Sequence, residues 1–430
     1  MPFVGLDLHK KEIESAIVSD DGKIELQKRF AATNEGTLAF ATQHLTKDHQ
    51  VAVEATTNTW ALVRLLQPFV HSVHVSNPLA TRAIATSRVK TDKVDALVLA
   101  QLLRTGFLPT VWTPDAQTAE LRQRCTERAN LTQDRTRVKN RIHAILHQRM
   151  IPLPAGDLFS DANLTWLASV DLNPFDRSCL ARQLFFLDMI ETEITLFNDD
   201  LAQHAYHSPE VKLLMTLPGV DFPVAETILS TLGDWKRFPD GDHAAAYFGL
   251  VPSTRQSADK CYHGPITKQG SGHARWMLVQ AAQHLDKHPG PLGAFFRRIM
   301  KKKTRNVAVV AVARKIVTIA WQMLKNNEPY RYADPKTTEA KMSRLRIRAT
   351  GERRKGGNPK GQPRPATYGS GEPTRGVPAL EMVYEKESLP PIATLPPGEV
   401  KMLAEQGVAA YVEQIRQSRR LPKRRVPPSA

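Results

Sequence analysis

A chain of 430 residues, 41% hydrophobic and 24% charged, is long enough for two or three domains with cores of their own. Its formal net charge of +16 indicates a polyanionic partner, nucleic acid first and an anionic membrane surface second. Three widely spaced cysteines without a CxxC pair fit a reducing cytoplasm and argue against a disulfide framework or structural zinc.

Neither the N-terminus nor the later apolar stretch suggests export or membrane insertion. "MPFVGLDLHK" meets charged residues too early for a secretory signal. The stretch "NVAVVAVARKIVTIAWQML" is interrupted by Arg314 and Lys315 and is shorter than the roughly 20 apolar residues that a span needs. We therefore expect a soluble, cytoplasmic protein associated with the nucleoid.

The first 112 residues alternate between strand and helix patterns. Apolar or alternating runs predict strands at 3–8, 13–18, 23–30, 49–56 and 71–77. Helical spacing predicts helices at 34–45, 58–69 and 91–104. Three strands in a row, followed by strand and helix in alternation, favour an α/β sheet with an antiparallel edge.

Three further regions follow in the predicted organisation. Residues 113–207 hold two long helical stretches, 119–150 and 182–204, which predict an antiparallel hairpin or coiled-coil arm. Residues 208–330 read as a compact, mainly helical unit. Residues 331–430, with 13 of the 30 prolines and a basic excess, predict a largely disordered tail, apart from one isolated helix near its end.

Four acids of the first region could form one site. Asp7 lies inside an apolar strand and Glu54 ends another, while Asp92 and Asp95 stand one helical turn apart on one helix face. A carboxylate in a buried strand is costly unless it is paired or binds a metal. Mg²⁺ or Mn²⁺ prefers such oxygen ligands, and two-metal sites use them for phosphoryl transfer.

Each acid alone has a simpler interpretation. Asp92 could cap its helix, where the helix dipole favours an acid, and Asp7 could be a surface acid on an edge strand. The set of four, in this order of strands and helices, is harder to explain that way. The arrangement resembles the RNase H-like fold, and RuvC-type nuclease domains in particular.

Two stretches of the 208–330 region suit contact with phosphates. The polar segment 249–275, "GLVPSTRQSADKCYHGPITKQGSGHAR", reads as a loop with Ser253 and Ser257 among glycines and basic residues. Taken alone, this segment is a weak signal, and an ordinary phosphate-contacting surface loop explains it more readily. "TLPGVDFPVAETIL", 216–229, resembles a helix-hairpin-helix element, although a plain αα-hairpin fits the residues as well.

Together these stretches resemble one family, the insertion-sequence transposases with an N-terminal DEDD RuvC-like domain and a C-terminal serine-bearing domain. Piv DNA invertases are relatives, and members are bridge-RNA-guided recombinases. The resemblance rests on "GLDLHK", "VEAT", "KTDKVDALVLAQLL", "VKNRIHAIL", "LPGV…AETILSTLGD", "YFGLVPSTRQS", "GPITKQG" and "ARKI", in this order over residues 1–330. It does not extend to the tail.

The resemblance implies a site and a mechanism. Asp7, Glu54, Asp92 and Asp95 would hold Mg²⁺ or Mn²⁺, and Ser257, rather than Ser253, would attack the DNA phosphate to form a phosphoserine intermediate. Members often have Ser-Gly where this chain has Ser-Ala. The implied partners are donor and target DNA and a guide RNA. A homodimer formed through the arm and assembling into a tetramer would unite the acids with the serine.

Basic residues near these motifs are the predicted nucleic-acid contacts. They are Lys90, Arg135, Arg137, Lys139, Arg141, Arg255, Lys268 and Arg275. Two competing functions stay open from sequence: a RuvC-like, structure-selective nuclease that uses the acids alone, and a non-catalytic nucleic-acid binder. DNA inversion is a third alternative to transposition.

Overall fold

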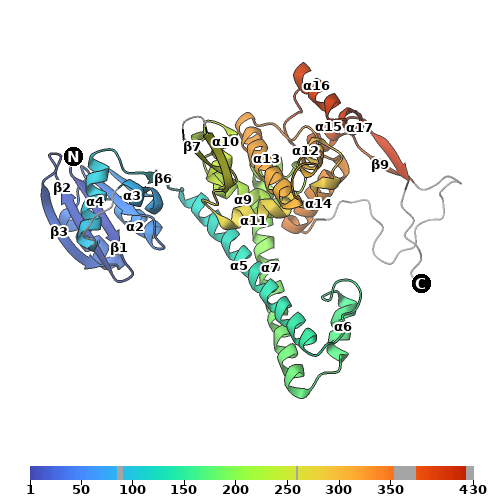
Figure 1. Ribbon diagram of the computed structural model, residues 1–430, viewed down its shortest axis with the longest axis horizontal. Helices are drawn as coiled ribbons and strands as arrows, with labels where there is room; N and C mark the ends of the chain where they lie inside the picture. The colour runs from blue at the N-terminus through green and yellow to red at the C-terminus, as the bar shows by residue number, and fades with distance from the viewer. Residues whose placement is uncertain (85–90, 258–259, 353–373, 423–430) are drawn as a thin grey trace. The chain divides into compact units, whose positions relative to one another are not determined.

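The computed structural model describes residues 1–84, 91–257, 260–352 and 374–422, and divides the chain into two compact units. Unit 1 is Met1–Asp115 and unit 2 is Ala116–Ala430. The first contains a mixed sheet with helices, whereas the second is mainly helical (Figure 1). The four predicted segments remain a finer division than these two units.

Unit 1 is built on a six-stranded sheet in the order β3-β2-β1-β4-β5-β6. Its strands are β1 (Phe3–Leu8), β2 (Glu12–Val18), β3 (Ile24–Ala31), β4 (Gln50–Glu54), β5 (Ser72–Ser76) and β6 (Thr110–Val111). β1, β4 and β5 run parallel, while β2, β3 and β6 pair antiparallel. The predicted mixed α/β sheet with an antiparallel edge is confirmed; the two-residue β6 is an addition that no sequence pattern marked.

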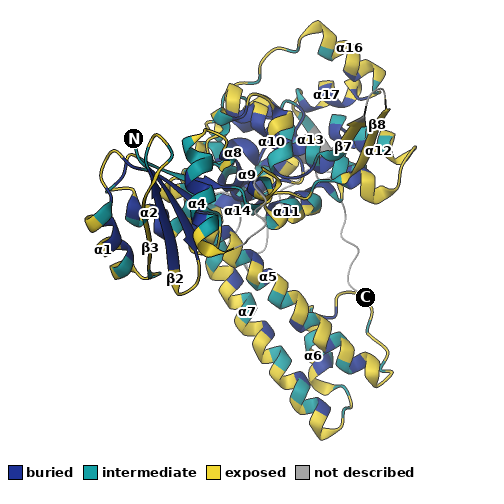
Figure 2. Ribbon diagram, turned by 60° about the vertical axis from the view of Figure 1, so that its left-hand side comes forward, coloured by how far each residue is buried: buried dark blue, intermediate teal, exposed yellow. Residues whose placement is uncertain are grey.

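Helices cover both faces of this sheet (Figure 2). Val4 and Leu6 of β1 are fully buried in a core with α1 (Asn34–His44) and α2 (Thr59–Leu66). On the other face lies α4 (Asp92–Arg104), whose Leu99 packs with Ala52 of β4. A further short helix, α3 (Pro78–Ile84), was not predicted.

Gly5 sets the distance between β1 and α4. A Cβ at this position would lie 1.9 Å from the carbonyl oxygen of Ala96 and 2.7 Å from the backbone nitrogen of Ala100. Such distances are far inside van der Waals contact, so only glycine lets the helix backbone approach the strand this closely. The first turn of α4 is thereby held over the strand that carries Asp7.

Unit 2 begins with two long helices that lie side by side, α5 (Ala116–Gln148) and α7 (Pro174–His207) (Figures 1 and 2). The buried residues Leu180, Leu187, Ile194 and Leu201 of α7 recur every seven positions, the spacing of a helix packed lengthwise on another. A short helix, α6 (Asp161–Ser169), was not predicted; its Leu167 joins the core at one end of the pair.

The rest of unit 2 packs around one large apolar core. Its elements are α8 (Pro209–Leu214), α9 (Phe222–Leu232), α10 (Gly241–Tyr247), the hairpin β7 (Pro252–Ser257) and β8 (Lys260–Ile266), α11 (Gly272–Ala282), α12 (Pro291–Met300) and α13 (Arg305–Asn326). Segment 249–275, predicted as a loop, contains the antiparallel hairpin instead, because a polar two-stranded ribbon needs no apolar alternation when both its faces meet solvent.

Helix α13 has 22 residues and is long and apolar enough to cross a membrane by those two criteria. The prediction that this stretch is too short was therefore wrong about its length. Its ten buried residues, among them Val312, Ile316 and Trp321, pack in the core of unit 2. Burial against other helices accounts for its hydrophobicity.

The prediction of a largely disordered tail does not hold for the described residues beyond 331. They form α14 (Pro335–Thr350), β9 (Thr374–Val377), α15 (Leu380–Lys386), α16 (Pro397–Glu405), α17 (Ala409–Ile415) and β10 (Arg419–Pro422). Leu380, Tyr384 and Ile415 are buried in the main core, so a few well-spaced apolar side chains fold a segment whose overall composition is polar. Most of the proline-rich stretch 351–376 lies outside the described residues.

Lys341 of α14 ties this C-terminal segment to the turn between α8 and α9. The side chain is buried, and its ammonium donates to the carbonyl oxygens of Met215, Leu217 (2.8 Å) and Val220 (2.8 Å). Burial lowers the pKa of Lys341 to about 8. Three carbonyl acceptors replace the water that the ammonium loses.

We expect the stability of unit 2 to fall as the pH drops from about 6.5 to 4. Burial lowers the pKa of both His273 and His288 to about 4. Between that value and the ordinary 6.5 the unfolded chain binds more protons, so protonation favours unfolding as the pH falls through this window. Urea unfolding at pH 7, 6, 5 and 4 measures the effect. His273→Phe should make the dependence shallower and the exposed-site control His147→Gln should not; a pH-independent midpoint would contradict the assignment.

Candidate metal and nucleic-acid sites

Asp7 and Glu54 of unit 1 lie at the same edge of the sheet. β1 and β4 are parallel neighbours whose last paired residues are Leu6 and Val53, immediately before Asp7 and Glu54. The carboxyl ends of parallel strands meet at one edge, so both acids stand there in adjacent strands. Thr59 fixes the chain after β4, because its hydroxyl donates to the Glu54 carbonyl at 2.8 Å.

The first turn of α4 brings a second pair of acids to Asp7. Thr91, not Asp92, caps this helix, accepting a hydrogen bond from the Val94 backbone N–H at 3.4 Å. Asp92 is thus free of the capping role that sequence left open. Asp92 and Asp95 both lie in the first helical turn, where the helix dipole favours negative charge.

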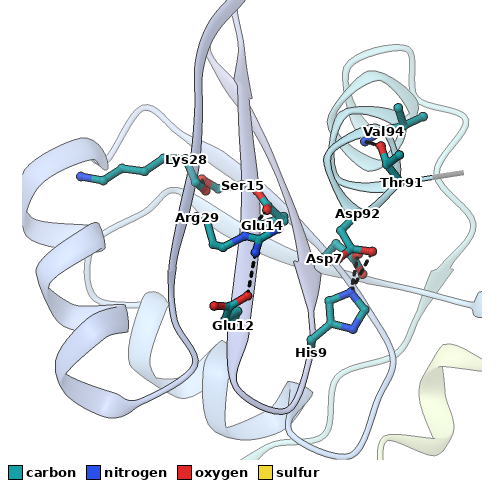
Figure 3. Close-up of polar contacts among 10 residues, drawn as sticks. All are labelled: Asp7, His9, Glu12, Glu14, Ser15, Lys28, Arg29, Thr91, Asp92 and Val94. Atoms are coloured by element: carbon teal, nitrogen blue, oxygen red, sulfur yellow. Dashed lines mark hydrogen bonds and ion pairs between the residues drawn. The ribbon is translucent and has the colours of Figure 1, made fainter.

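His9 lies between the strand acid and the helix acid (Figure 3). Its Nε2 is 3.0 Å from Asp7 Oδ2 and 3.3 Å from Asp92 Oδ1. The ligand atoms of these three residues all lie within 4.8 Å of one another. His9 was missed from the sequence, although it stands two residues after Asp7, the spacing that returns a strand residue to the same face.

Burial raises the pKa of Asp7, and the negative charges of Asp95 and Asp92 raise it further, while His9 lowers it. Asp7 is only 8% exposed. The elements of unit 1 therefore concentrate three carboxylates around a buried position, where their mutual repulsion favours a cation.

The neighbouring strand adds a further buried acid. Glu14 of β2 pairs with Asp7 in register and is 2% exposed. Arg29 Nε donates to Glu14 Oε1 at 2.5 Å, which leaves the buried Glu14 Oε2 without a hydrogen-bond partner among the described residues (Figure 3). An oxygen in that state needs a cation or water beside it.

The residues fit a divalent cation. Carboxylate oxygens are the ligands that Mg²⁺ and Mn²⁺ prefer, and an imidazole nitrogen is accepted more readily by Mn²⁺. Asp7, His9 and Asp92 form the tight part of the group. Asp95 contributes its charge to Asp7, and Glu54 stands at the same sheet edge with interactions of its own.

In unit 2, Ser257 is the last residue of β7 and pairs with Lys260 across the hairpin turn. The structure describes its backbone position but not its side chain. Arg255 pairs with Tyr262 two positions away, and both are exposed. Positions 255, 257, 260 and 262 thus share one face of the hairpin, where two basic residues and an aromatic accompany the serine position.

The predicted nucleic-acid contacts lie in different settings. Arg135 and Lys139 pair with Glu191 at 3.3 and 3.6 Å, and Arg137 pairs with Asp134 at 2.6 Å. Arg141, Arg255 and Lys268 are exposed, while Lys90 lies outside the described residues.

Arg275 stabilises the segment that contains the hairpin. Its Nη1 donates to the carbonyl oxygens of Phe248, Gln269 and Gly270 at 3.2, 2.5 and 3.2 Å. These contacts hold the two ends of the segment together. Its predicted role in nucleic-acid binding remains a prediction beside this structural one.

Comparison with known proteins assigns both regions. A family model of DEDD transposases of the IS110 type, described as "Transposase", matches residues 4–151, and one described as "Transposase IS116/IS110/IS902 family" matches residues 211–297. The chain carries the transposase domains of the IS110/IS116 family. The first match takes in all four acids and the second takes in the hairpin with Ser257.

Several relatives resemble this chain over most of their length. The transposase of insertion sequence IS1328 from Yersinia enterocolitica is 26% identical over 74% of this chain and 95% of its own length. The pilin gene-inverting protein of Moraxella bovis is 25% identical over 76% of this chain and 97% of its own. A Sinorhizobium fredii protein named as a transposase (y4qE) is 28% identical over 65% and 70%.

Proposed function

We propose that this protein acts as an insertion-sequence transposase, which recombines DNA by metal-assisted cleavage and rejoining through a phosphoserine intermediate. The observation that carries the proposal is the convergence of Asp7, His9 and Asp92, with their ligand atoms within 4.8 Å, at the carboxyl end of β1. A bound Mg²⁺ or Mn²⁺ would stabilise negative charge on the scissile phosphate. Asp7, Glu54, Asp92 and Asp95 would hold it.

In the proposed reaction the Ser257 hydroxyl oxygen forms a bond to phosphorus as the bond from phosphorus to the leaving oxygen breaks. The serine proton passes, overall, to that leaving oxygen. The phosphoserine ester keeps the energy of the phosphodiester, so the reverse attack rejoins the strand without ATP. The place of the serine at the end of β7, with the exposed Arg255 and Lys260 on the same hairpin face, supports contact with DNA phosphates.

We further propose a guide RNA as partner, together with donor and target DNA, and an oligomer built through the α5–α7 arm as a coiled coil. The net charge of +16 supports contact with more nucleic acid than the one DNA strand that would lie at the metal site. DNA inversion is the second candidate activity, because the relative named as a pilin gene-inverting protein matches over 97% of its own length.

The decisive experiment uses purified protein, Mg²⁺ and end-labelled DNA carrying the element's ends, with and without the adjacent noncoding RNA. Denaturing protein gels should show a DNA-linked band in wild type and in the matched control Ser253→Ala, four residues away on the same strand. The band should be absent from Ser257→Ala and should depend on the RNA.

Free cleaved DNA that persists in Ser257→Ala, with no protein-linked band in wild type, would replace the proposal by a nuclease that uses the acids alone. A protein-linked DNA band that forms without the RNA would rule out a guide RNA as a required partner. Binding of DNA without any cleavage in the presence of Mg²⁺ or Mn²⁺ would indicate that the protein is a non-catalytic nucleic-acid binder.

A further inference from the structure

A large cavity lies at the base of the β7–β8 hairpin in unit 2. Its volume is about 1100 Å³, which is ample for one or more nucleobases. Pro252 and Ile266, which pair at the base of the hairpin, form one wall, and Val307, Val310 and Trp321 of α13 form another. The lining is mainly apolar and includes two aromatic rings: Trp321, which is buried and whose indole N–H donates to the Trp235 carbonyl at 3.0 Å, and Phe295, which is only half-buried.

The turn that joins α12 to α13 ends two residues before Asn306, the first residue of α13 that lines the cavity, and the chain around this turn is strongly cationic. Arg298, Lys301, Lys302 and Lys303 are exposed, and none forms an ion pair with a described residue. Two arginines that flank them differ: Arg297 donates to backbone carbonyls, and Arg305 pairs with Asp286 at 3.0 Å. We call these four side chains the cationic turn.

Within the cavity the negative charges are already engaged. Asp242 pairs with Arg314 at 3.0 Å, and Asp240 caps α10 and accepts from His243. Asn306 and Gln322 add amide groups that can bond to the edge of a base, and Lys315 adds a positive charge. An apolar hollow with a few polar groups and a cationic border matches the chemistry of an unpaired nucleotide.

The hairpin connects this cavity to the serine position. Pro252 and Ser257 are the two ends of β7, five residues apart, which is about 17 Å along an extended strand. A DNA strand at Ser257 could therefore extend along the hairpin and reach the cavity within a few nucleotides.

We propose that this cavity binds unpaired bases of a DNA strand whose phosphates lie on the cationic turn. The occupant is single-stranded, because a base stacked in a duplex cannot enter a concave apolar hollow. A second copy of the chain is a poor occupant, since it would bring the same four cations. The choice of DNA rests on the proposed function.

The test measures binding in EDTA, which removes divalent cations, so that metal-dependent cleavage does not contribute to the signal. Fluorescence anisotropy at fixed salt compares a labelled 12-nucleotide dT strand with an abasic strand of equal length and charge. Wild type should bind the dT strand about tenfold more tightly, as stacking of a base on the half-buried ring of Phe295 predicts. Val307→Trp, at a 48% exposed position that lines the cavity, should abolish this ratio without weakening the abasic strand.

Val400→Trp is the matched control, because Val400 of α16 is 50% exposed and does not line the cavity. It should keep the wild-type ratio. Replacing Lys301, Lys302 and Lys303 by alanine should weaken both strands alike and reduce the dependence of binding on salt.

Equal affinity of wild type for dT and abasic strands would overturn the proposal, and so would a wild-type ratio in Val307→Trp. Preference for a 12-nucleotide rU strand would assign the cavity to RNA and overturn the choice of DNA. Because the readout is binding alone, the base-dependent ratio can hold while the protein-linked DNA band fails to form, and that combination would overturn only the proposed function.

Discussion

Asp7→Asn is expected to abolish Mg²⁺-dependent strand cleavage, by on the order of 10³-fold, while leaving unit 1 folded. Asparagine has the same shape but lacks the charge that a divalent cation needs. The substitution also removes a buried charge that lies near Asp92 and Asp95, so the unfolding temperature without metal should stay constant or rise.

Cleavage rates and a Mg²⁺ titration of the unfolding temperature, measured on the full chain, test both parts. Mg²⁺ should raise the unfolding temperature of wild type by binding the folded state, and should fail to do so in Asp7→Asn. Asp21→Asn is the control, since Asp21 is exposed in the β2–β3 turn and pairs with Lys23 at 2.9 Å. Wild-type cleavage by Asp7→Asn would show that the acid group is not the metal site.

Gly5→Ala should have the second large effect, although it adds only one uncharged methyl group. The new Cβ cannot remain 1.9 Å from the Ala96 carbonyl oxygen, so α4 or β1 must move by about 1.5 Å to reach ordinary contact. Overpacking of this kind typically costs about 1–3 kcal/mol. It also shifts the first turn of α4, and with it Asp92, away from Asp7.

Hydrogen exchange of the full chain can follow β1 and α4 separately, while cleavage assays follow the site. We expect faster exchange in both segments and a loss of Mg²⁺-dependent cleavage. Gly398→Ala provides the control, because a Cβ there meets no atom within 4 Å. Unchanged exchange and cleavage in Gly5→Ala would mean that the close approach of β1 and α4 is not required.

The sheet of unit 1 was predictable because its strands carry strong local signals. Runs such as "FVGLDL" are apolar on both faces, which is typical of a central strand with helices above and below. β6 has only two residues, too few for any periodicity, and pairs because its neighbours hold it against β5. The β7–β8 hairpin escaped prediction because its exposed strands lack the apolar alternation that identifies a strand.

The candidate site, like the fold, could be predicted only in part from the sequence. The four acids were visible as residue types in order, but the sequence could not reveal that Thr91 takes the capping role or that His9 lies between Asp7 and Asp92. The cap is a local hydrogen bond to Val94, whereas the place of His9 between the two acids depends on how closely α4 approaches β1, which Gly5 permits. The cavity beside the hairpin joins residues 252 and 321, a separation at which no pattern in the sequence reports proximity.

The buried ammonium of Lys341 also constrains the order in which unit 2 can fold during synthesis. The carbonyls of Met215, Leu217 and Val220 leave the ribosome more than a hundred residues before their donor. Until α14 emerges, the turn between α8 and α9 has no lysine to satisfy it, and the core lacks Leu380 and Tyr384 as well. Domains usually fold from the N-terminal end as they are made, so unit 1 can mature early while unit 2 waits for nearly the whole chain.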